Sequence, residues 1–549
     1  MPEEFTDFEK SALSRYCTNV DGDVFVLINM PEVVKGTLFS RYSRSPKSLK
    51  RLLLDEFISG SEIRLEELHP QASSDTRLEG AISKADNFYE RVLVEYGDDS
   101  VAELAGAHIA LENISNLATK FIEDARIGIS PLEKSSRYVY FNEKVNGNYK
   151  FYRDEYIMGT KYADEYISAC NLLFDTYSAL MPKMQQYFEE RFPRDESTSG
   201  RAYESAIRAK VCDTLRGLLP ASTLTNVGLF GNGRAFEYLI TKSRASKLSE
   251  ITHLGRKMHD ELSKVFPVFL KRAYSKHGDE AVQFFGSSSY PSFVKELRPF
   301  GGQEPVFLAD YDKDGTEKVI AAILYSGSAG VSMQKCIEIA NSMTDDEKIK
   351  VLRDYVGNRT NRRHKPGRAF ENTYYLFDIT ANFGAYRDLH RHRILTQERQ
   401  LLTVAHGYDI PYEIDDAGYE SEFREALENA ARVFWSLHSL SPIHAQYVVP
   451  FAYKVRWYIR MNLREAFHLI ELRSGRQGHR DYRRIAQDMY RKIKEVHPLL
   501  ADTMQFVDMK EYDLERLEAE KRKDQKLAGI CQGKEGQAPT SSDSACQET

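Results

Sequence analysis

The sequence predicts an α+β protein made of two tandem copies of one domain. Three observations support this. Similar sequence blocks recur in the same order in both halves of the chain. Segments with apolar residues spaced three and four apart, typical of helices, occur together with short apolar runs typical of strands. The length of 549 residues exceeds the roughly 250–300 at which a single core stops growing.

The internal repeat consists of matched blocks far apart in the chain. Both central blocks run from a glutamate through a long apolar pattern into an arginine followed by isoleucine. The matched blocks begin at Thr37 and Ala321, at Glu103 and Glu371, at Arg216 and Gln446, and at Asn232 and Asn462. Repeat one has the longer spacing between its blocks, so we expect extra residues between Tyr140 and Arg216.

The central blocks predict long helices over residues 103–127 and 371–394, and the apolar runs 24–28 and 319–325 predict strands. The Pro- and Gly-rich stretch SYPSFVKELRPFGGQE predicts the boundary between the copies. We therefore expect repeat one over residues 1–290, repeat two over 291–510, and a charged tail over 511–549. Within the tail we expect a solvated helix end up to Lys523, and disorder from about Lys521 onward, where the sequence is polar and has little to bury.

Composition excludes several classes of protein. The formal net charge is -6, so an anionic ligand requires a local cluster of cations rather than a basic surface. The six cysteines are widely spaced and form no CxxC pair, which argues against a disulfide framework or a thiolate zinc site. The acidic start, MPEEFTDFEK, does not resemble a signal peptide, and no apolar run reaches the roughly 20 residues of a membrane span. These features predict a cytoplasmic protein.

The run Leu389-HRHR-Ile394 is the most distinctive local feature. Such a run is often solvated surface. Zinc ligation by His390 and His392 is disfavoured, because residues two apart on a helix do not face each other. Arginine grips phosphate oxygens through a planar fork, so the run favours a phosphate-rich ligand, with a histidine placed to bond a heterocycle.

Arg391, His392 and Arg393, taken with a later block, resemble the motifs of flavin-dependent thymidylate synthases. That family carries Arg-His-Arg at the end of a long helix, then a Glu, a Ser and an Arg-Tyr pair. A later block follows the pattern Arg-x-x-x-Pro, Asn-x-Arg, His or Asn, and Leu-Arg. Its matches here are Asn462, Arg464, His468 and Arg473.

The resemblance implies a fold and a function. Members of the family have long helices with an antiparallel sheet, bind FAD, and transfer a carbon from methylene-tetrahydrofolate to dUMP, with NADPH as reductant and no cysteine nucleophile. They are homotetramers with active sites between subunits. Two fused copies therefore imply a homodimer that imitates four domains, with small-molecule partners, no membrane, and no nucleic acid.

The two repeats depart from the family pattern in complementary ways. Repeat two keeps Arg-His-Arg and has Glu398 in the place of the family glutamate, but Leu401 and Gln446 stand where a serine and an arginine are expected. Repeat one has lost Arg-His-Arg, which reads Asp124-Ala125-Arg126. It keeps other positions of the motifs: Glu133, Ser135, Arg137 with Tyr138, Arg216 with Pro220, and Asn232 with Arg234.

This complementarity leads to the hypothesis of one hybrid site per pair of repeats. Repeat one would clamp the nucleotide through Glu133, Ser135, Arg137 and Arg216. Repeat two would hold the flavin through Arg391, His392, Arg393, Glu398, Asn462, Arg464 and His468. Arg473 is the catalytic candidate, because a fixed guanidinium would stabilise negative charge developing on the uracil oxygens. No metal site is expected.

Two other functions fit the same residues. One is a related flavoenzyme that modifies another pyrimidine nucleotide, and the other is a non-enzymatic descendant that binds a nucleotide or nucleic acid. Individual residues also have plain structural interpretations: His468 as a core histidine, Asn462 and Arg464 as surface residues. The basic run Arg476, His479, Arg480, Arg483 and Arg484 is expected to be a solvated face.

Overall fold

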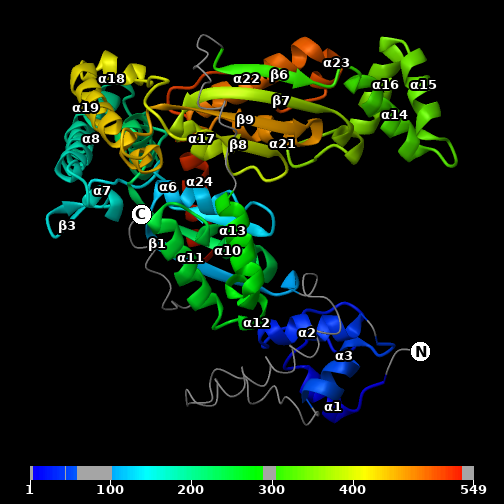
Figure 1. The fold of residues 1–549 in the computed structure, drawn as a ribbon. Coiled ribbons are helices and arrows are strands. Elements are labelled where there is room, and N and C mark those ends of the chain that lie inside the picture. The colour runs from blue at the N-terminus through cyan, green and yellow to red at the C-terminus, as the bar shows by residue number, and fades with distance from the viewer. Residues whose placement is uncertain (1–3, 44, 59–101, 288–303, 535–549) are drawn as a thin grey trace. The chain divides into compact units, whose positions relative to one another are not determined.

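A computed structural model describes residues 4–43, 45–58, 102–287 and 304–534 (Figure 1). The chain divides into two compact units, and one division between them falls in the predicted boundary stretch, but residues 134–224 of repeat one lie in the second unit. Unit 1 comprises Met1–Ile114, Ala118–Glu133 and Thr225–Arg298. Unit 2 comprises Ser115–Leu117, Lys134–Leu224 and Pro299–Thr549. A large part of repeat one therefore belongs to the same unit as repeat two.

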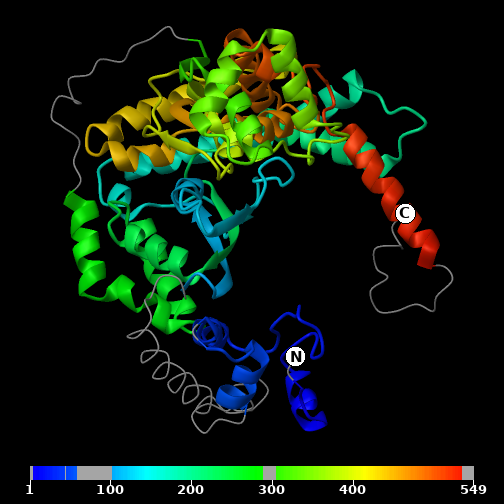
Figure 2. The same cartoon turned by 90° about the vertical axis from the view of Figure 1, so that its right-hand side faces the viewer.

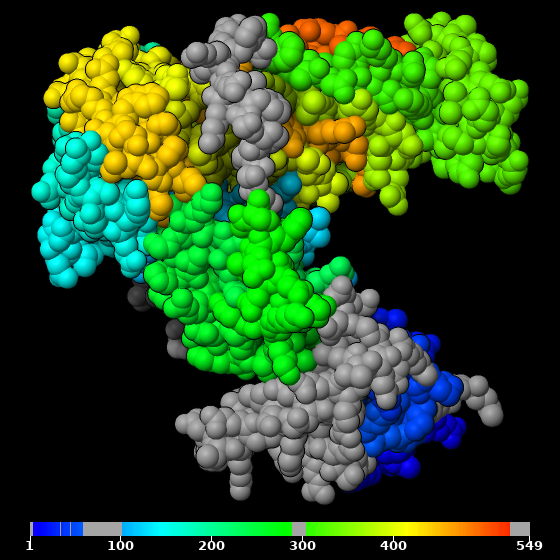
Figure 3. Space-filling model, in the orientation of Figure 1, coloured from blue at the N-terminus to red at the C-terminus, as the bar shows by residue number. Residues whose placement is uncertain are grey.

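Unit 1 is built on a three-stranded sheet in the order β1-β5-β2, formed by β1 (Gly106–Ser115), β5 (Leu224–Asn232) and β2 (Ile129–Glu133). β2 is antiparallel to β5, with Ile129 opposite Gly231. Its helices are α1 (Asp7–Leu13), α2 (Glu32–Tyr42), α3 (Leu49–Leu52), the π-helical η1 (Leu53–Ile58), α6 (Asn116–Glu123), α10 (Gly233–Arg244), α11 (Ser249–Leu262), α12 (Pro267–Leu270), η4 (Lys271–Tyr274) and α13 (Lys276–Ser287). One apolar core joins these elements, and α13 lies on the surface of the unit (Figure 3).

Unit 2 is built on a four-stranded antiparallel sheet in the order β6-β7-β9-β8, formed by β6 (Val306–Tyr311), β7 (Tyr374–Asn382), β9 (Lys454–Asn462) and β8 (Thr396–Arg399). Tyr374 faces Asn462, and Asn382 faces Lys454. A two-stranded hairpin, β3 (Lys144–Val145) and β4 (Asn148–Tyr149), is separate.

The helices of unit 2 come from both repeats. Repeat one contributes α7 (Glu155–Met158), α8 (Ala163–Arg191), α9 (Gly200–Leu215) and η3 (Arg216–Leu218). Repeat two contributes α14 (Gly315–Gly327), α15 (Met333–Ser342), α16 (Asp345–Val356), η6 (Arg368–Asn372), α17 (Phe383–Leu389), α18 (Tyr412–Asp416), α19 (Glu420–His438), α20 (Pro442–Ala445), η7 (Gln446–Val448), α21 (Leu463–Arg473), α22 (Arg480–Val496) and α23 (Pro498–Ala501). The last helix is α24 (Leu517–Lys534), drawn red in Figure 2.

The duplication is confirmed by matching elements. The orders β1-β5-β2 and β7-β9-β8 are the same, and each central strand runs into a helix capped by the asparagine of the Asn-x-Arg motif. Asn232 accepts from the backbone N–H of Ala235 at 2.8 Å, and Asn462 accepts from that of Glu465 at 2.9 Å. The α+β fold with two tandem copies is therefore as predicted. The longer spacing in repeat one includes α8, whose counterpart α19 is shorter.

The two long central helices were predicted wrongly. Each segment is a strand followed by a short helix: β1 then α6, and β7 then α17. Side chains of β7 alternate between buried and half-buried, with Tyr375, Phe377 and Ile379 inside. The spacing of three and four that suggested a helix combined residues of a period-two strand with residues of the helix after it.

Both predicted strands are also wrong. Residues 319–325 lie in α14, where Val319 to Ala322 are buried in one helical stretch. Short apolar runs do not distinguish a strand from a buried helix. Residues 24–28 contain only an isolated bridge between Leu27 and Cys17.

The disorder predicted for the tail is wrong up to residue 534, where the chain forms the helix α24. Glu515 and Arg516 are buried, and α24 follows them and packs against α9. Residues 535–549 of that tail lie outside the described part of the chain. None of the described helices is long and apolar enough to cross a membrane.

Candidate active site

Arg137 lies beyond the end of β2 and is almost fully buried in unit 2. Its Nε and Nη2 donate to the two oxygens of Asp213 at 2.8 and 2.7 Å, and its Nη1 donates to the Tyr482 hydroxyl at 2.9 Å. Burial favours the neutral acid, but the Arg137 charge and hydrogen bonds outweigh it and hold the pKa of Asp213 below its usual range. The Arg137–Asp213 pair is therefore ionised.

Arg216 begins the 3-10 helix after α9 and pairs with repeat two. Its Nη1 donates to Asp388 Oδ2 at 2.9 Å, and Arg391 Nη2 lies 3.5 Å from Asp388 Oδ1. Gly384 allows this approach, since a Cβ there would lie 3.2 Å from Arg216 Nε. Among the described residues, the buried Arg216 Nη2 has no hydrogen-bond partner.

Tyr482 and Asp388 connect the arginines of the two repeats. The Tyr482 ring centre lies 5.4 Å from the Arg137 guanidinium and 5.6 Å from that of Arg473. Burial opposes ionisation of Asp388, yet four arginine charges, from Arg216, Arg391, Arg137 and Arg473, hold its pKa well below the usual range. We call Arg137, Arg216, Arg391 and Arg473 the arginine cluster. With Asp213 and Asp388 it carries two more positive than negative charges.

His392 is buried beside this cluster in a defined tautomer. Arg473 Nε donates to His392 Nε2 at 3.0 Å, so the proton is on Nδ1, which donates to Glu465 Oε1 at 2.8 Å. Burial, reinforced by Arg473, lowers the pKa of His392 well below its usual range. Burial raises the pKa of Glu465 to about 7. His392 is therefore a neutral hydrogen-bonding group.

His468 adjoins the same group on α21, with its ring 5.3 Å from that of His392. Burial, with the nearby charges of Lys365, Arg362 and Arg473, lowers the pKa of His468 to about 4. Neutral imidazoles therefore stand among permanent cations. Sequence reasoning missed Lys365 and Arg362, which belong to no recognised motif.

The donor atoms of His392, Glu465 and His468 lie within 4.8 Å of one another, close enough to share a metal ion. The hydrogen bond from Arg473 argues against this use. It places the proton of His392 on Nδ1, the nitrogen that faces Glu465, and a protonated nitrogen is not a metal ligand. The surrounding cations also oppose a divalent ion, so the group suits hydrogen bonding to an organic ligand better.

The remaining predicted residues occupy different environments. Asn462 caps α21, and Arg464 donates to Pro366 O at 2.9 Å and to Glu371 at 3.2 Å. Arg393 and Glu398 are exposed. Ser135 Oγ accepts from the Arg137 backbone N–H at 3.2 Å.

Glu133 forms an ion pair within unit 1. It belongs to unit 1, where its carboxylate accepts from the buried Lys120 at 2.9 Å, and Lys120 also pairs with Glu123. This triad engages the Glu133 carboxylate in a buried ion pair, and its part in the nucleotide clamp stays a prediction.

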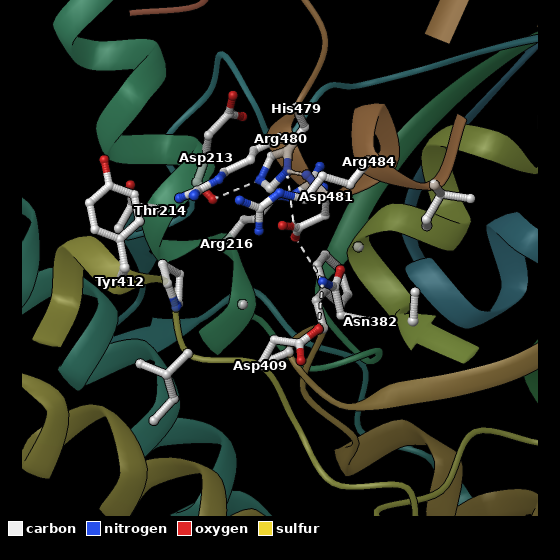
Figure 4. A pocket seen from close by; sticks show the side chains of 18 of the residues that line it. Asp213, Thr214, Arg216, Asn382, Asp409, Tyr412, His479, Arg480, Asp481 and Arg484 are labelled. Atoms are coloured by element: carbon white, nitrogen blue, oxygen red, sulfur yellow. Dashed lines mark hydrogen bonds and ion pairs between the residues drawn. The ribbon is translucent and has the colours of Figure 1, made fainter. Parts of the chain in front are cut away.

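A cavity of about 430 Å³ adjoins the arginine cluster (Figure 4). Asn382 links two of the six acidic residues in its wall, donating to Asp481 at 2.7 Å and to Asp409 at 3.2 Å. Other polar side chains in its wall are Asp213, Arg216, Tyr412, Lys454, His479, Arg480 and Arg484.

The prediction of a solvated face is wrong for His479 and Arg483, which are buried, and holds for Arg484, which is exposed. Arg483 is 2% exposed and donates to the backbone of Ser474 and Lys510, while His479, Arg480 and Arg484 line the cavity. The three- and four-residue spacing of His479, Arg480 and Arg483 along α22 could have signalled an inward face.

Comparison with known proteins now identifies the family. The sequence profile of a family described as thymidylate synthase complementing protein matches residues 54–268 and 307–499. The chain belongs to this family. The two matched regions correspond to the two repeats, so the resemblance found in the sequence and the tandem arrangement are confirmed.

Relatives within the thymidylate synthase complementing protein family match nearly the whole chain. A UPF0159 protein of Chlamydia pneumoniae is 45% identical over 534 residues, which cover 95% of this chain and 98% of the relative. UPF0159 proteins of Chlamydia muridarum and Thermoplasma acidophilum are 44% and 37% identical, over 95% and 90% of this chain and 98% and 99% of their own lengths. The similarity thus extends over both repeats of this chain.

A solved structure of a UMP/dUMP methylase PolB from Streptomyces cacaoi, bound with 5-Br dUMP, is 20% identical and covers 37% of this chain and 94% of its own. Its TM-score of 0.28 is too low to support any statement about the site.

Proposed function

We propose that this chain is a flavin-dependent enzyme that methylates dUMP to dTMP at a hybrid site built from both repeats. Membership of the thymidylate synthase complementing protein family supports the reaction class. The observation that carries the hybrid site is the arginine cluster, in which Arg137 and Arg216 of repeat one meet Arg391 and Arg473 of repeat two around Asp388.

The charge of the cluster favours a phosphate monoester. Two positive charges in excess of Asp213 and Asp388 match the near-dianionic phosphate of a nucleotide at neutral pH. The unpartnered Nη2 of Arg216 is a buried donor that an oxyanion satisfies, and a buried donor without an acceptor costs about 1–3 kcal/mol. Arg137 and Arg216 bind the phosphate in this proposal.

The residues on the repeat-two side fit FAD. A diphosphate needs cations, which Arg464 and Lys365 provide, and a flavin ring needs neutral hydrogen-bonding groups, which His392 and His468 provide. Bound FAD, reduced by NADPH, would supply the hydride that completes the methyl group.

The chain's own residues position and stabilise the pyrimidine. The methylene carbon of methylene-tetrahydrofolate replaces the hydrogen at C5 of the uracil, and tetrahydrofolate leaves. Negative charge develops on the uracil oxygens, and the half-buried Arg473, which contacts His392 and Tyr482, would stabilise it. Loss of one such donor typically costs about 2.7–4 kcal/mol in the transition state.

Two thiols of unit 2, Cys170 and Cys212, do not compete with this route. Burial raises the pKa of Cys170 and Cys212 to about 12, so neither forms a thiolate nucleophile at neutral pH. This supports a mechanism in which the flavin, rather than an enzyme thiolate, enables the transfer.

The purified protein provides the test. Flavin absorbance that persists after dialysis, and rescue of a thymidine auxotroph by the parent chain, are expected. Arg137→Ala in repeat one and Arg391→Ala in repeat two are each expected to abolish rescue, while Arg424→Ala, an exposed arginine on α19, preserves it. Rescue that survives Arg137→Ala would contradict the hybrid site, and a colourless chain that ignores added FAD would contradict flavin dependence.

We further propose a cytoplasmic homodimer as the working form, since two fused copies then reproduce a four-domain assembly. Sedimentation at about twice the mass of one chain is the expected result, and a monomer at working concentration would refute it.

A further inference from the structure

The segment between α23 and α24 lies beyond residue 499, where the family match ends. Two of its side chains are nevertheless buried within unit 2. Glu515 and Arg516 are 6% and 5% exposed. Glu515 Oε1 lies 3.3 Å from Lys210 Nζ, which is also 2.9 Å from Glu413 Oε1. This ion pairing anchors the segment at the wall of the cavity next to the arginine cluster.

Arg516 points from this segment toward the Arg137–Asp213 pair. Its guanidinium lies 3.8 Å from the centre of the Tyr138 ring, the residue after Arg137. Its Nε lies 4.0 Å from Asp213 Oδ2, the oxygen that accepts from Arg137 Nη2 at 2.7 Å. Arg516 therefore lies near Arg137, the arginine proposed to bind the phosphate, although 379 residues of sequence separate the two.

Arg516 has hydrogen-bonding capacity that the described chain does not use. Its buried Nε and Nη1 have no hydrogen-bond partner there, as is also true of Arg216 Nη2. All three atoms are donors, so the partner they lack is an acceptor. Because donors on a guanidinium are charged, an oxyanion relieves their burial cost better than a neutral group.

We propose that Arg516 is a third guanidinium of the phosphate clamp, which makes the C-terminal segment part of the substrate site. The inference rests on the proposed function, because the oxyanion it binds is the phosphate of the nucleotide. Arg516 acts with Arg137 and Arg216, and Tyr138 holds its guanidinium plane in place. The clamp of this chain thus extends beyond the region that defines the family.

The test compares a ligand that carries the phosphate with one that lacks it. Binding of dUMP and of deoxyuridine is measured by calorimetry on the full-length parent, on Arg516→Gln and on Arg516→Lys. The matched control is Arg522→Gln, on the exposed face of α24. Arg516→Gln is expected to weaken dUMP binding roughly 10- to 100-fold and to leave deoxyuridine binding unchanged. Arg516→Lys, which keeps the charge but loses the fork, is expected to fall between the two.

Each outcome decides the inference. Equal affinity of parent and Arg516→Gln for dUMP refutes it, and so does an equal loss for dUMP and deoxyuridine, which indicates a purely structural arginine. If Arg516→Gln does not fold, Arg516→Lys decides by the same comparison. A parent chain that binds neither ligand refutes the proposed function itself, an outcome distinct from failure at Arg516 alone.

Discussion

Replacing Asp388 by asparagine tests whether the arginine cluster is built for an anion. Asp388 is 5% exposed and pairs with Arg216 at 2.9 Å and with Arg391 at 3.5 Å. The Asp388→Asn change keeps the shape of the side chain and removes its charge. Of the two carboxylates that pair with the four guanidiniums of the arginine cluster, only that of Asp213 would then remain.

The magnitude follows from the burial of the pair. Removing one partner of a buried ion pair typically costs about 3–5 kcal/mol, because the remaining charge is left without compensation. A phosphate ion that occupies the cluster replaces that compensation. We therefore expect Asp388→Asn to lose about 3–5 kcal/mol of unfolding free energy in phosphate-free buffer. We expect added phosphate to raise the unfolding free energy of the variant by at least about 1.4 kcal/mol more than that of the parent, which is equivalent to tenfold tighter phosphate binding.

Urea unfolding with and without phosphate at constant ionic strength measures both quantities. The control is Asp416→Asn, since Asp416 forms an exposed pair with Arg191 and should change stability by no more than about 1 kcal/mol, with no phosphate effect. The reasoning is refuted if Asp388→Asn is as stable as the parent without phosphate, or if phosphate stabilises both chains equally.

Three further predictions follow from buried groups. In the folded protein the pKa of Glu465 is raised from 4.5 to about 7, so its contribution to stability is complete below pH 4.5 and is lost as the pH rises through 7. Between pH 4.5 and pH 8, the unfolding free energy of Glu465→Gln in urea should therefore rise by about 3 kcal/mol relative to that of the parent. Parallel pH profiles of the two proteins would contradict this. Arg359 donates to both oxygens of Glu471, at 2.7 and 2.5 Å, so Arg359→Met should destabilise unit 2 by about 3–5 kcal/mol in urea. The double variant with Glu471→Met should recover much of this loss. Additive effects of the two substitutions would show that the pair is not coupled. Cys170 and Cys212, with pKa values near 12, should resist iodoacetamide in the native protein at about pH 7.5, and rapid labelling detected by mass spectrometry would refute their burial.

The sequence predicted the duplication but not its secondary structure. Matched motifs preserve order and spacing even where individual residues diverge, so the two copies were recognisable. The segments at Glu103 and Glu371 were misassigned because a strand and the helix after it together imitate a helical period. The interior side of β7, with Tyr375 and Phe377, becomes evident only when β9 pairs with it.

The cations of the site were predictable, and their partners were not. Arg137, Arg216 and Arg391 belong to motifs whose residue types and spacing point to phosphate chemistry. Asp213 and Tyr482 belong to no motif, and their role depends on contacts such as that between Arg137 and Tyr482, which lie 345 residues apart. Local patterns carry no information about pairing over such separations.

The sharing of unit 2 between the repeats has a consequence for the order of events during synthesis. Arg216 leaves the ribosome 172 residues before the carboxylate that pairs with it. At about 5–20 residues per second, that interval lasts roughly 10–30 s. During this time Arg216 lacks the carboxylate that pairs with it in the folded chain, which favours delayed closure of the helices around it or protection by a chaperone until Asp388 emerges.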